Sequence, residues 1–308
     1  MPAVPTPFTA DDKIDVAAFE HFCNLQITVG ATALVVCGTT GEAPTLSTEE
    51  QHTLIRAARN VTRGRVPVIA GAGSNATAHA IALSRTAKAA GADALLSVVP
   101  YYNKPTQAGI EAHFRTIADA ADLPVILYDV PSRTVVTLTD ATVARLATHP
   151  RVVGLKDATG DVTRCERLKS LVPSGFRLLS GDDATAPTFL AQGGHGCISV
   201  TSNIAPGLCR ELFDALADGR LNEAHHLSKP IAALTRALAC AVNPVPVKFA
   251  LSVFGLMSAR VRLPLVELAA HDQQELTAVC RKLIDFGPSL SIAAEENAKG
   301  HLTRNMTR

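Results

Sequence analysis

The sequence predicts an α/β fold, a (β/α)8 TIM barrel followed by a helical appendage, with an open doubly wound sheet as the alternative. Short, nearly continuous apolar runs alternate with amphipathic stretches about eight times, at intervals of roughly 20 to 35 residues. Such runs are typical of parallel strands that helices cover on both faces. The chain has 308 residues, 47% of them hydrophobic. That is enough for one α/β domain of about 250 residues and an appendage.

The first half of the barrel is expected from an alternating series of strands and helices. A stub of a first strand at 4–8 begins so near the first residue that the chain looks clipped. Helix 15–30 has an apolar face and ends at Gly30. Ser47 and Glu50 form a capping box that opens the next helix. The other strands are expected at 32–37, 66–70, 94–98 and 124–128, and the other helices at 77–90, 107–121 and 139–148.

The second half continues the alternation and then gives way to helices alone. Strands are expected at 152–156, 177–180 and 196–200, and helices at 161–172, after 183, and at 205–217. Helical periodicity then covers 221–241, 246–256 and 265–286. The expected division is a catalytic barrel at 1–219, a helical domain at 220–288, and a polar, mobile tail at 289–308.

Composition excludes several classes of function. The net charge is +1, which does not indicate a nucleic acid or an anionic membrane surface as partner. No apolar run approaches the roughly 18 residues that span a bilayer, and the first residues do not resemble a signal peptide. The seven cysteines are scattered and odd in number, which favours buried, reduced thiols. We therefore expect a cytoplasmic protein whose partners are neither nucleic acids nor membranes.

One lysine stands at the centre of the predicted site. Lys156 ends the apolar strand 152–156, and catalytic groups of barrels collect at the C-terminal ends of strands. Apolar surroundings disfavour the ammonium form of a lysine, and only the uncharged amine attacks a carbonyl. The simpler alternative is a lysine that leaves its strand for solvent.

Residues at other strand ends suit the same chemistry. Tyr128 ends a strand and Tyr102 follows another, so phenols could relay protons to an imine on Lys156, with Thr39 in series. Hydroxyls and backbone N–H groups of the turn at 38–41 could hold a carboxylate, and Arg133 could hold a second one. Singly, such residues usually cap helices, pack or face solvent. Together they predict Schiff-base chemistry on a keto acid.

Six motifs extend this argument to a known family. They are Gly-Thr-Thr-Gly-Glu at 38–42, Pro-Tyr-Tyr-Asn-Lys-Pro at 100–105, Tyr-Asp-Val-Pro-Ser-Arg-Thr at 128–134, Gly-Leu-Lys-Asp-Ala-Thr-Gly at 154–160, Ser-Gly-Asp-Asp at 180–183 and Asn-Pro-Val-Pro-Val-Lys at 243–248. In order and spacing, from about residue 3 to 288, the chain resembles the dihydrodipicolinate (4-hydroxy-tetrahydrodipicolinate) synthases of the pyruvate-dependent class I aldolase superfamily.

This resemblance implies a barrel enzyme that condenses pyruvate with L-aspartate 4-semialdehyde, toward diaminopimelate and lysine, without a metal or organic cofactor. Lys156 matches the Schiff-base lysine, and Tyr128 the acid/base tyrosine. Thr39 and Tyr102 match the rest of the proton relay, with Tyr102 supplied by a neighbouring subunit of a homotetramer built as a dimer of dimers. The implied substrate-binding positions are Thr40 for the pyruvate carboxylate, Arg133 for the semialdehyde or product carboxylate, and the backbone around Gly181 and Ile198.

The resemblance also indicates how the chain is regulated. Lysine-inhibited bacterial members have histidines and a glutamate in a site at the dimer interface. Here Thr48 and Gln51 stand in place of the histidines, and His79 stands in place of the glutamate. We therefore expect inhibition by lysine to be weak or absent. The other matching positions are Ala43, Asn75 and Tyr101.

Alternatives within the superfamily remain open. Sialic acid lyases and 2-keto-3-deoxy-sugar-acid aldolases and dehydratases share such a lysine and tyrosine. Pro-Ser-Arg at 131–133, and the pair Tyr101 and Tyr102, favour the synthase. A non-catalytic paralogue is a further alternative. Retention of the lysine, the relay residues and the arginine together argues against it.

Two other classes of enzyme are disfavoured. The segment 71–76 fits a loose dinucleotide-binding pattern, but Asp93 precedes its strand, whereas the ribose-binding acid should follow one. His225 and His226 are adjacent and so point to different faces of a helix. The pair at 182–183 lacks a clear third metal ligand.

Overall fold

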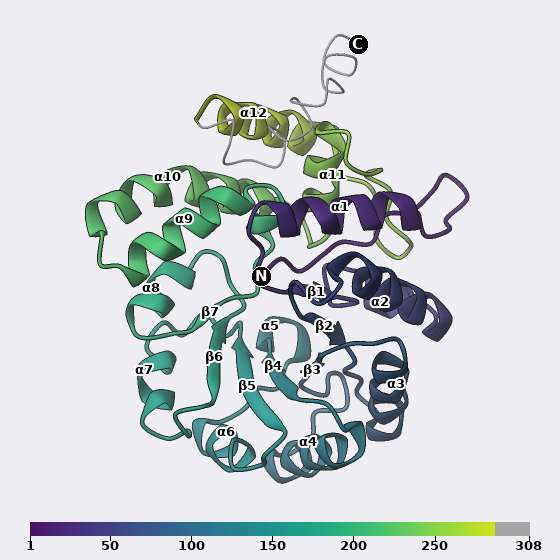
Figure 1. Ribbon diagram of the computed structural model, residues 1–308, viewed down its shortest axis with the longest axis vertical. Helices are drawn as coiled ribbons and strands as arrows, with labels where there is room; N and C mark the ends of the chain where they lie inside the picture. Colours follow the sequence, from purple (N-terminus) through teal and green to yellow (C-terminus); the bar gives the residue numbers. More distant parts are fainter. Residues whose placement is uncertain (287–308) are drawn as a thin grey trace.

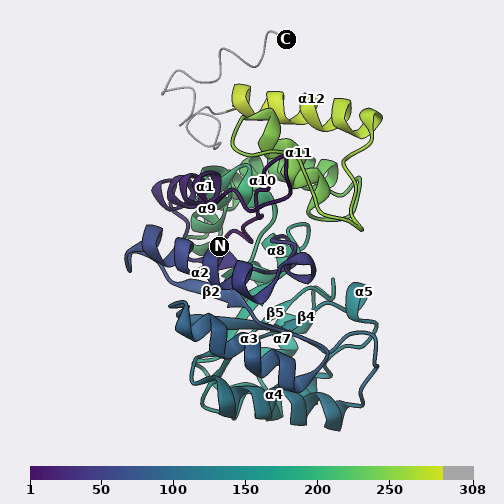
Figure 2. The ribbon, with the colours of Figure 1, turned by 90° about the vertical axis from the view of Figure 1, so that its right-hand side faces the viewer.

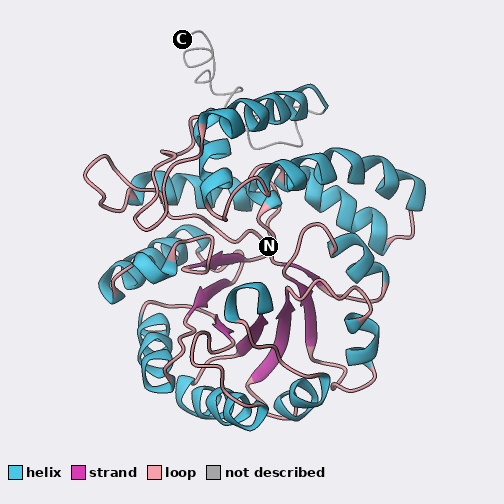
Figure 3. Ribbon diagram, turned by 180° about the vertical axis from the view of Figure 1, so that it is seen from behind, coloured by secondary structure: helices cyan, strands magenta, loops and turns pink. Residues whose placement is uncertain are grey.

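A computed structural model of the chain describes residues 1–286. Seven parallel strands form one curved sheet in chain order, and helices surround it (Figures 1 and 3). The strands are β1 (Leu34–Val36), β2 (Val68–Gly71), β3 (Ala94–Val98), β4 (Val125–Asp129), β5 (Val152–Asp157), β6 (Arg177–Ser180) and β7 (Gly196–Cys197). The expected tail at 289–308 lies outside the described residues.

The N-terminal segment fills the gap between the first and last strands. Ala3 pairs with Val35 in parallel, and Pro2 pairs with Ser199, just beyond β7. The Val4 N–H donates to the Val35 carbonyl at 2.8 Å. The first strand therefore lies at the start of the chain rather than at 4–8 as expected. Prolines at 5 and 7 have no N–H to give to a ladder, which explains the shift.

The helices around the strands follow the expected alternation. They are α1 (Val16–Thr28), α2 (Thr48–Thr62), α3 (Thr77–Ala89), α4 (Gln107–Ala121), α6 (Asp140–Leu146), α7 (Arg164–Lys169), α8 (Ala186–Ala191) and α9 (Pro206–Ala217), with short 3-10 turns η1 (Ala43–Thr45) and η2 (Thr201–Asn203). A further helix, α5 (Pro131–Thr134), is a single turn after β4 that was not expected from the sequence. The barrel prediction is confirmed, and the open doubly wound alternative is wrong.

Several expected elements are shorter than predicted. Helix α7 begins at Arg164, not at 161, because Thr163 N–H donates to Asp161 Oδ1 at 3.0 Å and Asp161 N–H to Thr159 Oγ1 at 3.2 Å. Such side-chain to backbone bonds compete with the first helical turn. Strand β7 ends at Cys197 rather than at 200, and α12 begins at 270 rather than at 265.

Alternate side chains of each strand enter two separate apolar clusters. Val35, Leu96 and Ile126 belong to the cluster inside the barrel. Their neighbours Leu95 and Leu127 belong to the larger cluster between strands and helices. This period of two is what a sheet buried on both faces requires. It decides which residues at the strand ends face the interior.

Three further helices follow the barrel. They are α10 (Leu221–Leu238), α11 (Val245–Val253) and α12 (Ala270–Phe286), at the end of the molecule opposite α4 (Figure 2). Helix α10 packs along α9. The domain boundary at 219/220 stays a prediction. Within the described part of the chain, none of the helices is long and apolar enough to cross a membrane.

Candidate active site

Lys156 and Tyr128 are neighbours across two strands. They are register partners at the C-terminal ends of β5 and β4. Both are buried, at 6% and 7% exposed. The Lys156 Nζ lies 4.2 Å from the centroid of the Tyr128 ring. The structure therefore places an amine against a phenol inside the barrel, where the sequence analysis expected a nucleophile and its proton carrier.

Gly181 leaves room for the lysine side chain. It directly follows β6, and its N–H donates to the Asp157 carbonyl at 2.6 Å. A Cβ built on Gly181 would lie 2.9 Å from Lys156 Cε and 3.0 Å from Ala158 Cβ. A residue with a side chain would therefore push Lys156 from its position.

Ile198 directly follows β7, the strand that pairs with β6. Its N–H donates to the Ser180 carbonyl at 2.9 Å, and its side chain belongs to the interior cluster. Both backbone positions taken from the resemblance thus lie just beyond strand ends, Gly181 against Lys156 and Ile198 one strand further along the sheet. Their role in binding substrate stays a prediction.

The turn after β1 brings two threonines to the site. Thr39 is half-buried and lines a cavity of about 430 Å³ together with Tyr128 and Arg133. Thr40 is 2% exposed, and its Oγ1 accepts a hydrogen bond from Asn243 Nδ2 at 3.0 Å. The two hydroxyls therefore differ in availability: one faces the cavity and the other is held by an amide.

Asn243 joins the turn to the arginine at the edge of the site. The exposed Arg133, in α5, donates from Nη2 to the Asn243 carbonyl at 3.3 Å. Asn243 thus contacts both predicted carboxylate-binding residues, Arg133 and Thr40. In the sequence, Asn243 stands out only as part of the motif at 243–248. Because Asn243 follows the barrel in sequence, after the stretch that forms α10, no sequence pattern predicted its contacts with the barrel.

Tyr102 stands apart from the other site residues of its own chain. It is 88% exposed, with a φ of +72°. The neighbouring Tyr101 lines the cavity instead. Of the three tyrosines, Tyr128 is therefore the one that packs against Lys156 within one chain, and the relay role of Tyr102 stays a prediction.

A buried ion pair fixes the end of the 38–42 turn. Glu42 has a φ of +56° and is 2% exposed. Its Oε1 accepts from Lys248 Nζ of α11 at 2.6 Å, and its Oε2 from the Arg262 N–H at 3.0 Å. Burial lowers the pKa of Lys248, and Glu42 opposes that shift. The Lys248 Nζ also lies 4.2 Å from the Phe8 ring centroid.

This pair shows what the appendage does for the barrel. Helix α11 inserts a fully buried lysine beneath the turn that carries both threonines. A buried charge without a partner would be costly, so Glu42 and Lys248 depend on one another. Both residues belong to motifs of the sequence, at 38–42 and 243–248, but their pairing was not predicted.

The cavity also reaches the positions that the resemblance assigns to a lysine-binding site. Its lining includes Ala43, Thr48, Gln51, His79 and Tyr101. No Asp or Glu occurs among the described residues that line it. Across residues 1–286, no group of three or more His, Cys, Asp or Glu is placed to hold a metal ion.

Comparison with known proteins identifies the family. A family model described as "Dihydrodipicolinate synthetase family" matches residues 1–283. The chain belongs to this family. The family assignment confirms the resemblance that the six motifs carry.

Individual members of the family are similar over most of their length. The 4-hydroxy-tetrahydrodipicolinate synthase of Hyphomonas neptunium (strain ATCC 15444) is 53% identical over 267 residues, 86% of this chain and 91% of the relative. That of Rhodospirillum centenum (strain ATCC 51521 / SW) is 52% identical over 264 residues, 86% of this chain and 90% of the relative.

A solved structure of the family agrees with the fold. The chloride-inhibited dihydrodipicolinate synthase from Acinetobacter baumannii, complexed with pyruvate, is 43% identical. It superposes with a TM-score of 0.89, over 91% of this chain and 96% of that one.

Proposed function

We propose that this protein is a lyase that condenses pyruvate with L-aspartate 4-semialdehyde to 4-hydroxy-tetrahydrodipicolinate, through a Schiff base on Lys156. The observation that carries the proposal is the buried Lys156 amine 4.2 Å from the Tyr128 ring, at the C-terminal end of the barrel. Relatives that share about half of its residues have the same named activity. No metal or organic cofactor takes part in the proposed reaction.

The first half of the reaction joins pyruvate to the enzyme. The uncharged Lys156 amine attacks the keto carbon, and the carbinolamine loses one water to form the imine. The Tyr128 hydroxyl transfers the protons, and Thr39, which lines the same cavity, is the next member of the proposed relay. The 38–41 turn, with Thr40, holds the pyruvate carboxylate through hydroxyl and N–H groups.

The second half forms the new carbon–carbon bond. The imine loses a methyl proton to give an enamine, which attacks the aldehyde carbon of the semialdehyde. Arg133, exposed at the edge of the cavity, binds the carboxylate of this second substrate. Cyclisation by the substrate amine then displaces Lys156 and regenerates the enzyme.

Oligomer formation is part of the same proposal. We infer a homotetramer, a dimer of dimers, in which Tyr102 enters the relay of a neighbouring subunit. Its 88% exposure within one chain supports this role. We place the reaction in the cytoplasm, since Cys240 is exposed as a free thiol and the other six cysteines are buried and free.

Complementation between subunits tests the role of Tyr102. Tyr102→Phe and Lys156→Ala proteins, each inactive, are unfolded together, refolded and assayed. Hybrid assemblies should regain activity, because a Tyr102→Phe chain keeps Lys156 and receives Tyr102 from its partner. Absence of any regain, with hybrids shown by native mass spectrometry, contradicts a relay shared between chains.

A reductase-coupled assay with both substrates tests the function as a whole. The wild-type protein should convert pyruvate and the semialdehyde to product. The Arg133→Met variant should have a higher KM for the semialdehyde, with imine formation from pyruvate unchanged. Imine formation without turnover would move the function to a keto-sugar-acid aldolase or dehydratase. Absence of both would indicate a non-catalytic barrel.

A further inference from the structure

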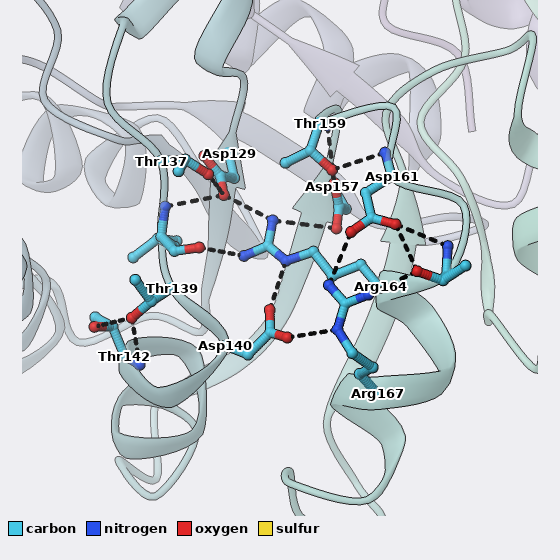
Figure 4. A network of polar contacts seen from close by, with 12 residues as sticks. Asp129, Thr137, Thr139, Asp140, Thr142, Asp157, Thr159, Asp161, Arg164 and Arg167 are labelled. Carbon is cyan, nitrogen blue, oxygen red and sulfur yellow. Dashed lines mark hydrogen bonds and ion pairs between the residues drawn. The ribbon is translucent and has the colours of Figure 1, made fainter.

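A buried arginine joins the two site strands from the outer side of the sheet (Figure 4). Arg164 is the first residue of α7 and is 3% exposed. Its Nη1 lies 2.8 Å from Asp129 Oδ2 and 3.3 Å from Asp157 Oδ2. Asp129 ends β4 and Asp157 ends β5, so one guanidinium contacts the last residue of each strand.

These two aspartates directly follow the two central residues of the site. Tyr128 and Lys156 are register partners, and Asp129 and Asp157 form the next pair. Successive side chains of a strand point to opposite faces of the sheet. Tyr128 and Lys156 face the barrel interior, and the carboxylates therefore face the helix layer that contains Arg164. Arg164 therefore contacts the residue that directly follows each of the two reacting residues in the sequence.

The remaining contacts of Arg164 extend this connection to the loop after α5. Its Nη2 donates to the Leu138 carbonyl at 2.6 Å, and its Nε to Asp140 Oδ1 at 3.0 Å. Asp129 Oδ2 also accepts from Thr137 Oγ1 at 2.8 Å and from the Leu138 N–H at 3.0 Å. The segment that follows the Arg133 turn is thus fixed to the same two strands.

Charge makes this cluster dependent on Arg164. Asp129 is fully buried and Asp157 is 5% exposed. Burial raises the pKa of the Asp129 carboxyl, and the Arg164 guanidinium opposes that rise. Without the arginine, two buried carboxylates on neighbouring strands would lose their shared cation. Breaking such a buried arrangement is strongly unfavourable, and the strand ends would shift to relieve it.

We propose that Arg164 is a positioning residue for the imine-forming step, holding the ends of β4 and β5 so that the Lys156 amine stays against the Tyr128 phenol. The inference rests on the proposed function. Arg164 touches neither substrate nor the reacting atoms, so its effect passes through Asp129 and Asp157. A displacement of about 1 Å at reacting groups can cost about a hundredfold in rate.

The test compares two arginines on the same helix. Arg164→Lys keeps the charge but loses the fork that reaches several acceptors, and Arg164→Met removes the charge. Arg167→Met is the matched control. Arg167 binds Asp161 at 2.8 Å and shares Asp140, at 2.9 Å, with Arg164, but its ion pairs are not with Asp129 or Asp157, the two strand-end carboxylates.

Single-turnover trapping of pyruvate with borohydride gives the readout. The rate constant of trapping reports the geometry of folded molecules, and the amplitude reports how many are folded. Arg164→Lys should lower the rate constant by about tenfold or more, with KM for pyruvate changed less than about threefold. Arg167→Met should keep the rate constant within about twofold of the wild type.

Other outcomes of this experiment would contradict the proposed role of Arg164. If Arg164→Lys lowers the amplitude alone and keeps the wild-type rate constant, Arg164 only stabilises the fold and the proposal is wrong. If the Arg164→Met protein does not fold, the trapping rate constant of Arg164→Lys alone tests the proposal. If the wild type itself traps no pyruvate, the proposed function fails, and that outcome is distinct from equal trapping by wild type and variant.

Discussion

The Lys156 amine lies 4.2 Å from the centre of the Tyr128 ring, and the two residues are register partners on adjacent parallel strands. This relationship follows from the barrel itself, because paired positions on neighbouring strands point to the same side. The interior of the barrel is apolar, and the Lys156 amine and the Tyr128 hydroxyl lie where the strands reach their C-terminal ends. Catalysis then depends on what keeps the pair in place.

Gly181→Ala should impair Lys156 without unfolding the protein. The added Cβ would lie 2.9 Å from Lys156 Cε, and the flexible lysine would move before the backbone does. We expect the rate of pyruvate trapping to fall by about tenfold or more. Gly175→Ala is the control, since a Cβ there meets nothing within 4 Å. Equal trapping rates in the two variants would contradict this account of Gly181.

The Glu42 and Lys248 pair should behave as a unit in unfolding experiments. Lys248→Met leaves a buried carboxylate and should cost about 3–5 kcal/mol in the free energy of unfolding. Glu42→Gln should cost less, because burial already favours the neutral form of Lys248. The double variant should be more stable than the sum of the single effects predicts. Denaturant titration of all four proteins checks this, and simple additivity would refute it.

His113 should make stability depend on acid pH. It is 6% exposed, and burial lowers the pKa of His113 from 6.5 to about 4. The unfolded chain therefore takes up a proton between about pH 6.5 and pH 4 that the folded chain does not. The free energy of unfolding therefore has its full value above pH 6.5, and it falls by up to a few kcal/mol as the pH falls to about 4.

The measurement is urea unfolding at about pH 7 and about pH 4.5. His113→Gln should lessen the loss between the two pH values, and the exposed His225→Gln should not. The Thr77 Oγ1, 2.9 Å from His113 Nδ1, can still bond to the glutamine. An unchanged pH dependence in His113→Gln would show that another group carries it.

Lysine should inhibit this protein weakly or not at all. The described lining of the 430 Å³ cavity contains His79 and Arg133 but no carboxylate to pair with the lysine ammonium. Titration in the coupled assay should show little inhibition below millimolar lysine, and His79→Glu should increase it. Half-inhibition of the wild type at sub-millimolar lysine would contradict this expectation.

Strand-end residues were predictable from sequence because the barrel fixes where they gather. The strand positions, which apolar runs mark clearly, were enough to predict four residues of the site: Lys156, Tyr128, Thr39 and Arg133. Helix α5 was missed since one turn of four residues has no periodicity to detect.

Contacts between distant segments were not predictable in this way. Arg164 looks like a polar start to a helix, and its partners Asp129 and Asp140 lie 35 and 24 residues away. Asn243 and Lys248 return to the barrel from beyond α10, across more than 200 residues of sequence. Such pairings depend on tertiary packing, which single-sequence patterns do not encode.

Trapping of pyruvate on one lysine tests the central claim most directly. The protein is reduced with borohydride in the presence of pyruvate, digested and mapped by mass spectrometry, with Lys156→Ala alongside. We predict an adduct of pyruvate minus water plus two hydrogens on Lys156, and none in the variant. An adduct on Lys248, the other buried lysine of the site region, or no adduct in the wild type, would contradict the assignment of Lys156 as the nucleophile.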